Sequence, residues 1–248
     1  MSGHSKWSTI KRKKGALDAK RGKLFTKLIK EISIAVREGG DDPASNPRLR
    51  LAIQNAKGVN MPKENIDRAV KKGSATDSEN YFETTYEGYG PNGIPVFVEC
   101  TTDNINRTVQ NVRFAFSKWG GSLGTNGSLE FMFDRKGIFN IIKPQSLEED
   151  DFTFEVIDAG AEEVEFQDDY IHIICALEDF GKMQRKIEEL GLEPEVSELH
   201  RVPKNRVELD NEALQKVIKL IEVLEDDDDV QKVYHNIDIK EDQYEFFS

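Results

Sequence analysis

The chain has 248 residues, 38% of them hydrophobic and 32% charged, and its net charge at pH 7 is −12. This length suits one to three domains, and the hydrophobic content suffices for more than one small core. The sequence lacks both an apolar run of 18 residues and an apolar signal core, which argues against membrane-spanning and secreted proteins, so we expect a cytoplasmic one. Cys100 and Cys175 lie in strand-like apolar runs, a pattern that predicts buried free thiols rather than a disulfide or a thiolate metal site.

Basic residues gather at the N-terminus. Residues 1–30 hold ten Lys or Arg and one acid, a local charge of +9, whereas residues 74–248 carry −23. Such a separation predicts that the basic end docks on a polyanion. The polar stretch 73–80 coincides with the charge boundary and has no large apolar residue, so we place a linker there and a first domain over residues 1–80.

Residues 20–73 predict three helices behind a basic arm, and hence an all-α N-terminal domain. The first helix has an apolar stripe and is stopped by Gly39-Gly40. The second is capped by Asn46-Pro47, and the third begins at Pro62.

The period of the apolar residues changes after the linker. Turn-forming residues fill 86–95, a strand is predicted over 96–100, a helix begins at Asp103 or Asn104, and another strand is predicted over 129–133. The following elements are, in order, strand 138–142, helix 147–159, strands 163–166 and 170–176, helix 180–190 and strand 194–202. This βαββαβ order is that of a complete ferredoxin-like unit.

Residues 81–134 alone supply only strand, helix and strand, while 210–224 predict a capped helix followed by a strand over 230–237. We therefore predict an α+β multidomain protein in which residues 81–134 and 204–248 form a second ferredoxin-like domain, with residues 135–203 inserted into it. The alternative is a continuous domain with a helical C-terminal appendage, which leaves an apolar sheet face uncovered.

The arm over residues 2–15 interleaves hydroxyl groups, one indole and a run of four cations. Lys and Arg neutralise phosphates, hydroxyls bond phosphate oxygens, and Trp7 is suited to stack on an unpaired base. A solvated charge run with Trp7 in the core is the alternative. We predict nucleic-acid contacts at Lys6, Trp7, Lys11, Arg12, Lys13, Lys14, Lys20, Arg21, Lys23 and Lys27, with Lys30 extending the same surface along the partly exposed face of the first helix.

A second polar patch covers residues 101–108, at a strand-to-helix junction where helix amides and Arg107 are placed to hold an anion. Asp103 argues against a bare phosphate, and a simple helix cap is the alternative.

The remaining motifs indicate no catalysis. The glycine-rich stretches 88–93 and 120–124 do not fit a phosphate-binding fingerprint, and the four histidines lack the spacing of metal ligands. The acidic run 225–229 is interpreted as a solvated turn between helix and strand. We predict no enzyme activity, no cofactor, no metal and no small-molecule substrate.

Six motifs follow one another in order between Ser2 and Gly124: SGHSKW from Ser2, AKRGKLFTKLIKEI from Ala19, DPASNPRLRLAIQNAK from Asp42, NMPKENIDRA from Asn60, YEGYGPNGIPVFVECTTDNINRT from Tyr86 and GGSLG from Gly120. Together they resemble the YebC family, which includes the mitochondrial translational activator of cytochrome c oxidase. The resemblance implies three domains, and a role as a DNA-binding transcriptional regulator or as a ribosome-associated translation factor that helps synthesis through consecutive prolines. It also adds His4 to the nucleic-acid contacts, because residues 3–7 match the opening signature of the family.

Three hypotheses follow for function. The first is a regulator of gene expression that binds DNA. The second is a factor that contacts ribosomal or transfer RNA, with the ribosome as a further candidate partner. The third is a protein-interaction scaffold that uses its acidic body. In each case we expect a monomer without a membrane partner.

Overall fold

The structure, a computed structural model, describes residues 18–75, 81–167, 169–240 and 242–243. Contacts within the chain divide it into two compact units. The first comprises residues 1–31, 77–134 and 202–248, and the second comprises residues 32–76 and 135–201. Helix α2 (Asp18–Gly39) begins in the first unit and ends in the second.

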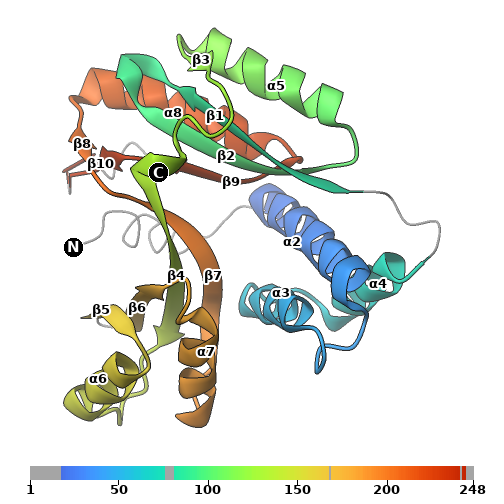
Figure 1. The fold of residues 1–248 in the computed structure, drawn as a ribbon, viewed down its shortest axis with the longest axis vertical. Coiled ribbons are helices and arrows are strands. Elements are labelled where there is room, and N and C mark those ends of the chain that lie inside the picture. Colours follow the sequence, from blue (N-terminus) through green and yellow to red (C-terminus); the bar gives the residue numbers. More distant parts are fainter. Residues whose placement is uncertain (1–17, 76–80, 168, 241, 244–248) are drawn as a thin grey trace. The chain divides into compact units, whose positions relative to one another are not determined.

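The first unit is built on a four-stranded sheet of order β3-β1-β2-β9, with helices α5 and α8 on one of its faces (Figure 1). A separate parallel pair joins β8 to β10. The elements are β1 (Phe82–Tyr89), η1 (Pro91–Gly93), β2 (Pro95–Thr102), α5 (Ile105–Lys118), β3 (Ser122–Leu123), η2 (Glu130–Met132), β8 (Val207–Glu208), α8 (Asn211–Asp226), β9 (Val230–His235) and β10 (Ile237–Asp238).

Strand β2 carries the core of this unit because it is buried on both faces. Val96 and Val98 point toward the helices, where they meet residues such as Phe116 of α5 and Val217 of α8. Phe97 points the other way and packs with Leu129, Phe133 and Tyr234. A strand covered on both sides needs an uninterrupted apolar run, which residues 96–98 provide.

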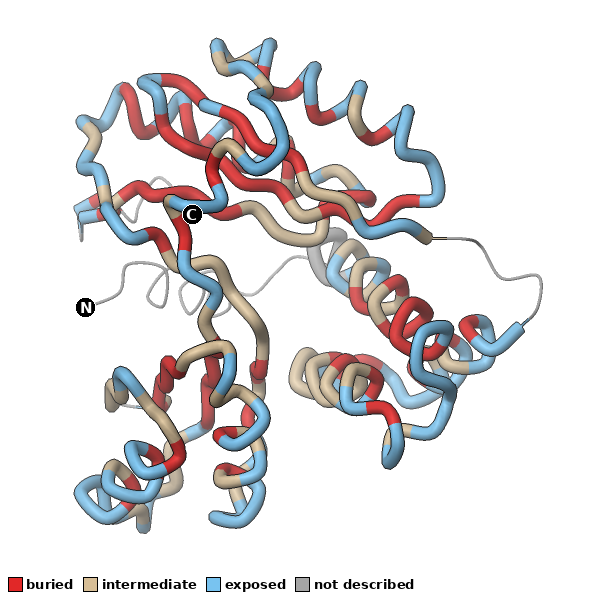
Figure 2. Tube along the Cα trace, viewed as in Figure 1, coloured by how far each residue is buried: buried red, intermediate tan, exposed pale blue. Residues whose placement is uncertain are grey.

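The second unit combines the later part of α2 with two further helices and a second four-stranded sheet of order β5-β6-β4-β7. Figure 2 shows the buried stretch of α2, residues 32–36. Helices α6 and α7 pack on one face of the sheet through a core that includes Phe139, Ile171 and Met183. The elements are α3 (Pro47–Gly58), α4 (Lys63–Gly73), β4 (Phe133–Ile142), α6 (Glu149–Asp158), β5 (Ala161–Phe166), β6 (Tyr170–Ala176), α7 (Phe180–Glu189) and β7 (Pro194–Pro203).

Helix α3 docks against the edge strand β7. The Asn55 side chain accepts from the Ser197 amide (3.1 Å) and donates to the Ser197 carbonyl (2.9 Å), so it satisfies backbone groups that an edge strand otherwise exposes. The approach is close at Gly58, where an added Cβ would lie 2.1 Å from the Glu195 carbonyl oxygen. Only glycine fits that contact.

The predicted three-helix N-terminal region and the α+β class with two helix-backed sheets are confirmed. Two local predictions are wrong. Residues 86–89, interpreted as part of a turn, belong to β1, and residues 130–132, interpreted as a strand, form the short helix η2. Gly88 explains the first error, because it lies inside a strand at a point where a Cβ would be 2.5 Å from the Ser122 carbonyl oxygen. Among the described helices, none has the length and apolarity needed to cross a membrane.

Candidate nucleic-acid interface

The predicted contact residues fall into three groups in the structure. Residues 4–14, which include His4, Trp7 and the four-cation run, lie outside the described residues. Lys20 and Arg21 lie in α2, where the structure describes only their place in the helix. The described side chains are those of Lys23, Lys27 and Arg107, and all three lie in the first unit.

Two junctions of that unit meet at one edge of its sheet. Strands β2 and β9 are antiparallel neighbours, with Cys100 opposite Val230, so the end of β2 lies beside the start of β9. The β2–α5 junction and the segment Glu225–Asp229, here called the acidic turn, are therefore adjacent. The Thr101 amide donates to the Asp229 carbonyl at 2.7 Å.

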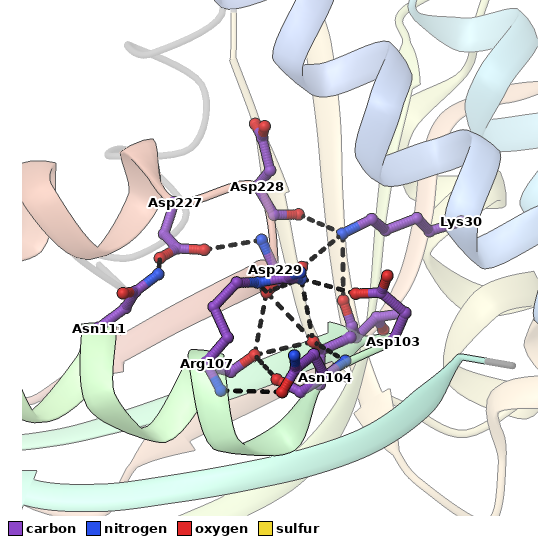
Figure 3. Close-up of polar contacts among 11 residues, drawn as sticks. Lys30, Asp103, Asn104, Arg107, Asn111, Asp227, Asp228 and Asp229 are labelled. Atoms are coloured by element: carbon purple, nitrogen blue, oxygen red, sulfur yellow. Dashed lines mark hydrogen bonds and ion pairs between the residues drawn. The ribbon is translucent and has the colours of Figure 1, made fainter. Parts of the chain in front are cut away.

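The Asp229 carboxylate is the centre of a buried polar cluster (Figure 3). Lys30 Nζ lies 2.9 Å from Asp229 Oδ1, and the Arg107 guanidinium donates to Oδ2 through Nε (3.2 Å) and a terminal nitrogen (2.6 Å). The hydroxyls of Thr102 and Thr108 lie 3.1 and 2.9 Å from the same Oδ2. The Asp229 side chain is 5% exposed and that of Lys30 is 10% exposed, so both charges are buried and paired.

These bonds keep Asp229 ionised. Burial by itself raises the pKa of a carboxyl group, but the hydrogen bonds from Arg107, Lys30 and Thr108 outweigh burial and lower the pKa of Asp229 below its ordinary value. The pKa of Arg107 is raised by its bonds to Asp229 and to Asp103, whose carboxylate accepts at 2.6 Å. The cluster is therefore a stable pairing of full charges at neutral pH.

Three lysines of α2 meet the acidic turn. Lys23, Lys27 and Lys30 recur at the four- and three-residue spacing that places them on one side of a helix. Lys23 donates to the Asp226 carbonyl (2.9 Å) and also to the Asp226 carboxylate, and Lys27 donates to the Glu225 carbonyl (2.9 Å).

Lys30 completes the row by donating to the Asp228 carbonyl at 2.7 Å, while the Asp228 carboxylate points away from it (Figure 3). The last carbonyls of a helix lack partners within that helix and carry partial negative charge. Lys23 and Lys27 thus cap the C-terminal end of α8, and Lys30 bonds the chain just beyond it.

Two expectations need correction. Lys30 was expected to extend an exposed surface, but it is buried against Asp229. The acidic run was expected to be a solvated turn, and Asp226 and Asp228 are exposed, but Asp229 is buried and binds four side chains. Arg107 binds the carboxylates of Asp103 and Asp229 in the structure, and its contact with nucleic acid stays a prediction.

The role of Asp229 was missed by sequence reasoning. One signal was present, because the polar patch over 101–108 holds Thr102, Thr108 and Arg107, three side-chain donors with only one local carboxylate, that of Asp103. Their acceptor lies more than 120 residues further along the chain. Within the described part of the chain, no three His, Cys, Asp or Glu side chains form a group able to hold a metal ion.

Comparisons with known proteins match nearly the whole length of this chain to one family. The family model described as the TACO1/YebC protein N-terminal domain matches residues 5–76, and the one described as the TACO1/YebC second and third domain matches residues 81–237. A probable transcriptional regulatory protein of Amoebophilus asiaticus is 58% identical over 239 residues, covering 96% of this chain and 98% of the relative. One from a Geobacillus species is 51% identical over 240 residues, covering 96% and 98%.

A solved structure has the same fold. The crystal structure of the conserved hypothetical protein Aq1575 from Aquifex aeolicus matches with a TM-score of 0.80 at 44% identity, and the match covers 90% of this chain and 93% of that one. The family models together span far more than half of the sequence. The chain therefore belongs to the TACO1/YebC family.

Proposed function

We propose that this chain is a cytoplasmic regulator of gene expression that binds DNA through its basic N-terminal segment and acts on transcription. The observation that carries the proposal is the division of charge, +9 over residues 1–30 against −23 over residues 74–248. The relatives are described as probable transcriptional regulatory proteins, which supports the regulatory role. The role is one of binding, without a catalytic step.

The contacts to nucleic acid are assigned first to the arm and the start of α2. Lys23, Lys27 and Arg107 already bind groups of the protein, so each takes part only by leaving its internal partner. The residues of the primary surface are His4, Lys6, Trp7, Lys11, Arg12, Lys13, Lys14, Lys20 and Arg21.

The exposed face of α4 is less suited to a polyanion. It presents Lys63, Arg68 and Lys71 together with the acids Glu64 and Asp67. Acids at this density repel phosphates and weaken the counterion release that drives binding. This face supports the assignment to the arm rather than to a recognition helix in the three-helix region.

RNA is the second candidate target, in the form of ribosomal or transfer RNA contacted by a translation factor. The arm favours it on one ground, the presence of Trp7 among hydroxyls and cations. A single aromatic ring stacks on unpaired bases, which are common in folded RNA and rare in a DNA duplex. A protein scaffold that uses its acidic body is the remaining alternative.

We also propose the domain limits 1–80, 81–134 with 204–248, and 135–203, with both α+β parts ferredoxin-like. The strand order β5-β6-β4-β7 of the second sheet, together with the chain order βαββαβ, supports this for residues 135–203. The chain segments that flank residues 135–203 are adjacent, since the Lys204 amide donates to the Met132 carbonyl at 3.0 Å, and this supports the proposed insertion.

Replacing Lys11, Arg12, Lys13 and Lys14 together by Ala tests the arm. We expect a large loss of affinity for a short DNA duplex and a shallower salt dependence, because the log–log slope on duplex DNA changes by about 0.9 for each phosphate that the variant no longer neutralises. Fluorescence anisotropy over a salt titration measures both. The matched control changes Lys63, Arg68, Lys71 and Lys72 of α4 to Ala, which removes the same charge from another exposed surface. Equal losses in the two variants would contradict the proposal.

Ultraviolet crosslinking in growing cells, followed by sequencing of the recovered DNA and RNA, distinguishes the targets. Discrete promoter peaks that disappear in the four-residue arm variant support the transcriptional role. Ribosomal or transfer RNA that disappears in the same variant replaces it with the translational role. Recovery of neither nucleic acid leaves the protein scaffold.

A further inference from the structure

We propose that the acidic turn, Glu225–Asp229, is an internal competitor of nucleic acid for Lys23 and Lys27. This inference rests on the proposed function, because it assigns to the binding surface a built-in occupant that a polyanion displaces. It concerns the two lysines that follow the arm and that bond a carboxylate and a backbone carbonyl of the acidic turn in the structure.

The contacts between α2 and the acidic turn divide into an inner and an outer part. The inner part is the buried pair of Lys30 and Asp229, with side chains 10% and 5% exposed. The outer part is the pair of Lys23 and Asp226, with side chains 38% and 74% exposed. Water and salt reach the outer pair, so its free energy is small, whereas breaking the inner pair leaves a buried charge. The outer pair can therefore open while the inner pair holds the helix in place.

Lys23 and Lys27 extend the basic stretch of the arm along α2. Lys20, Lys23 and Lys27 follow one another at three- and four-residue spacing along α2, directly after the arm. A nucleic acid that binds the arm reaches this stripe next. A phosphate oxygen offers Lys23 the same kind of partner as the Asp226 carboxylate, an anionic oxygen acceptor, and it offers Lys27 an anionic acceptor in place of the Glu225 carbonyl.

Moving a lysine from the acidic turn to a phosphate changes the free energy little, so the acidic turn influences the affinity for nucleic acid. Opening the outer pair costs little, and each lysine that moves to a phosphate releases a condensed counterion. Asp226 and Asp228 both have exposed side chains, so they also repel an approaching polyanion. Neutralising Asp226 removes the anionic competitor for Lys23, leaves the Asp226 carbonyl in place and does not touch the inner pair.

The test compares full-length variants that differ only at exposed side chains. Asp226→Asn removes the carboxylate that pairs with Lys23. Glu222→Gln is its matched control, because Glu222 is an exposed acid one turn earlier on α8 that pairs with Lys219 instead of an α2 lysine. Lys23→Ala, alone and combined with Asp226→Asn, completes a double-mutant cycle. The readout is anisotropy of a labelled DNA duplex and of a labelled single-stranded RNA at low salt, with thermal melting of each variant to check the fold.

We expect Asp226→Asn to bind about two- to fivefold more tightly than the wild type, the size of one exposed ion pair. The gain should be absent when Lys23 is Ala and smaller in Glu222→Gln. A gain that persists without Lys23, or that Glu222→Gln reproduces, would mean a general charge effect and would overturn the competitor while leaving the proposed function intact. If no variant binds either probe, the proposed function fails and the inference fails with it.

Discussion

Asp229 ties three elements together through one carboxylate. Lys30 comes from α2, Arg107 and Thr108 come from α5, and Thr102 ends β2. Isolated buried charges are costly, so the cluster is stable only while each charge keeps its partner. A change of the Asp229 side chain therefore affects all three elements.

Asp229→Asn is expected to lower the free energy of unfolding by about 2–4 kcal/mol, because it leaves the Lys30 ammonium buried without a counter-charge. Urea denaturation at neutral pH measures the loss. Asp226→Asn is the control, since its solvent-exposed pair with Lys23 should account for only a small part of such a loss. Similar losses in the two variants would show that the inner pair is not the stabilising one.

His172 makes the stability of the second unit depend on pH. Its Nδ1 lies 2.5 Å from Asn140 Oδ1, and its Nε2 has no hydrogen-bond partner among the described residues. Burial first, and then the neighbouring His200, lower the pKa of His172 to about 4, although Glu198 acts in the opposite direction. The ring is therefore neutral in the folded protein at pH values where an unfolded histidine is already charged.

Stability should fall as the pH is lowered from about 6.5, the unfolded pKa, to about 4, the folded pKa, by a total of about 3 kcal/mol. Below that window the contribution of His172 to stability is constant. Stability should then fall further because of Asp229, whose pKa is lowered in the folded protein, since the stabilisation by its ionised carboxylate is lost as the group becomes protonated. Urea unfolding at a series of pH values measures both. His172→Gln should remove the slope above pH 4, and an unchanged slope in that variant would assign it to another group.

At the scale of elements, helix ends and strand edges decide how the pieces join. Asn46 caps α3 by accepting from the Leu49 amide (3.0 Å), and its side-chain nitrogen also donates to the carbonyls of Ala35 and Gly40 at the end of α2. One residue thus completes two helix ends. Helix α3 is then positioned to place Asn55 and Gly58 against β7.

Gly58→Ala is expected to separate α3 from β7, because the new methyl group would lie 2.1 Å from the Glu195 carbonyl oxygen. The clash is with backbone, which cannot move aside without a large cost in free energy. We expect a loss of about 2–4 kcal/mol in unfolding free energy and faster amide exchange at Ser197. Gly22→Ala is the control, since an added Cβ there meets no atom within 4 Å. Equal exchange at Ser197 in both variants would show that the contact is not restrictive.

At the scale of the whole molecule, the two chain segments that flank the proposed insertion, residues 135–203, are adjacent. The Lys204 amide bonds the Met132 carbonyl, and the Lys204 ammonium lies 3.3 Å from the Asp134 carboxylate. Segments whose ends lie this close can be removed without stretching the remaining chain. This arrangement supports the proposed insertion over a continuous domain.

Replacing residues 135–203 by a short Gly-Ser linker is expected to leave the sheet β3-β1-β2-β9 folded with helices α5 and α8. Circular dichroism and urea denaturation should show a cooperative transition with a smaller m value, because less surface is exposed on unfolding. The control removes residues 120–188, a segment of the same length that cuts through both proposed domains. A non-cooperative transition in the first variant, like that expected of the second, would favour the continuous-domain alternative.

The sequence by itself determined the helix starts and the charge division, whereas residues 86–89 and 130–132 were assigned wrongly. Caps such as Asn46, Asn104 and Asp210 lie at the predicted helix starts, because a capping hydrogen bond joins residues only three apart. Tertiary structure alone decided the state of the charges. Lys23 and Asp226 are separated by 203 residues, and no local pattern indicates that they pair. Whether a charge run is solvated or paired depends on which segments folding brings together, and periodicity reports only which side of an element is apolar.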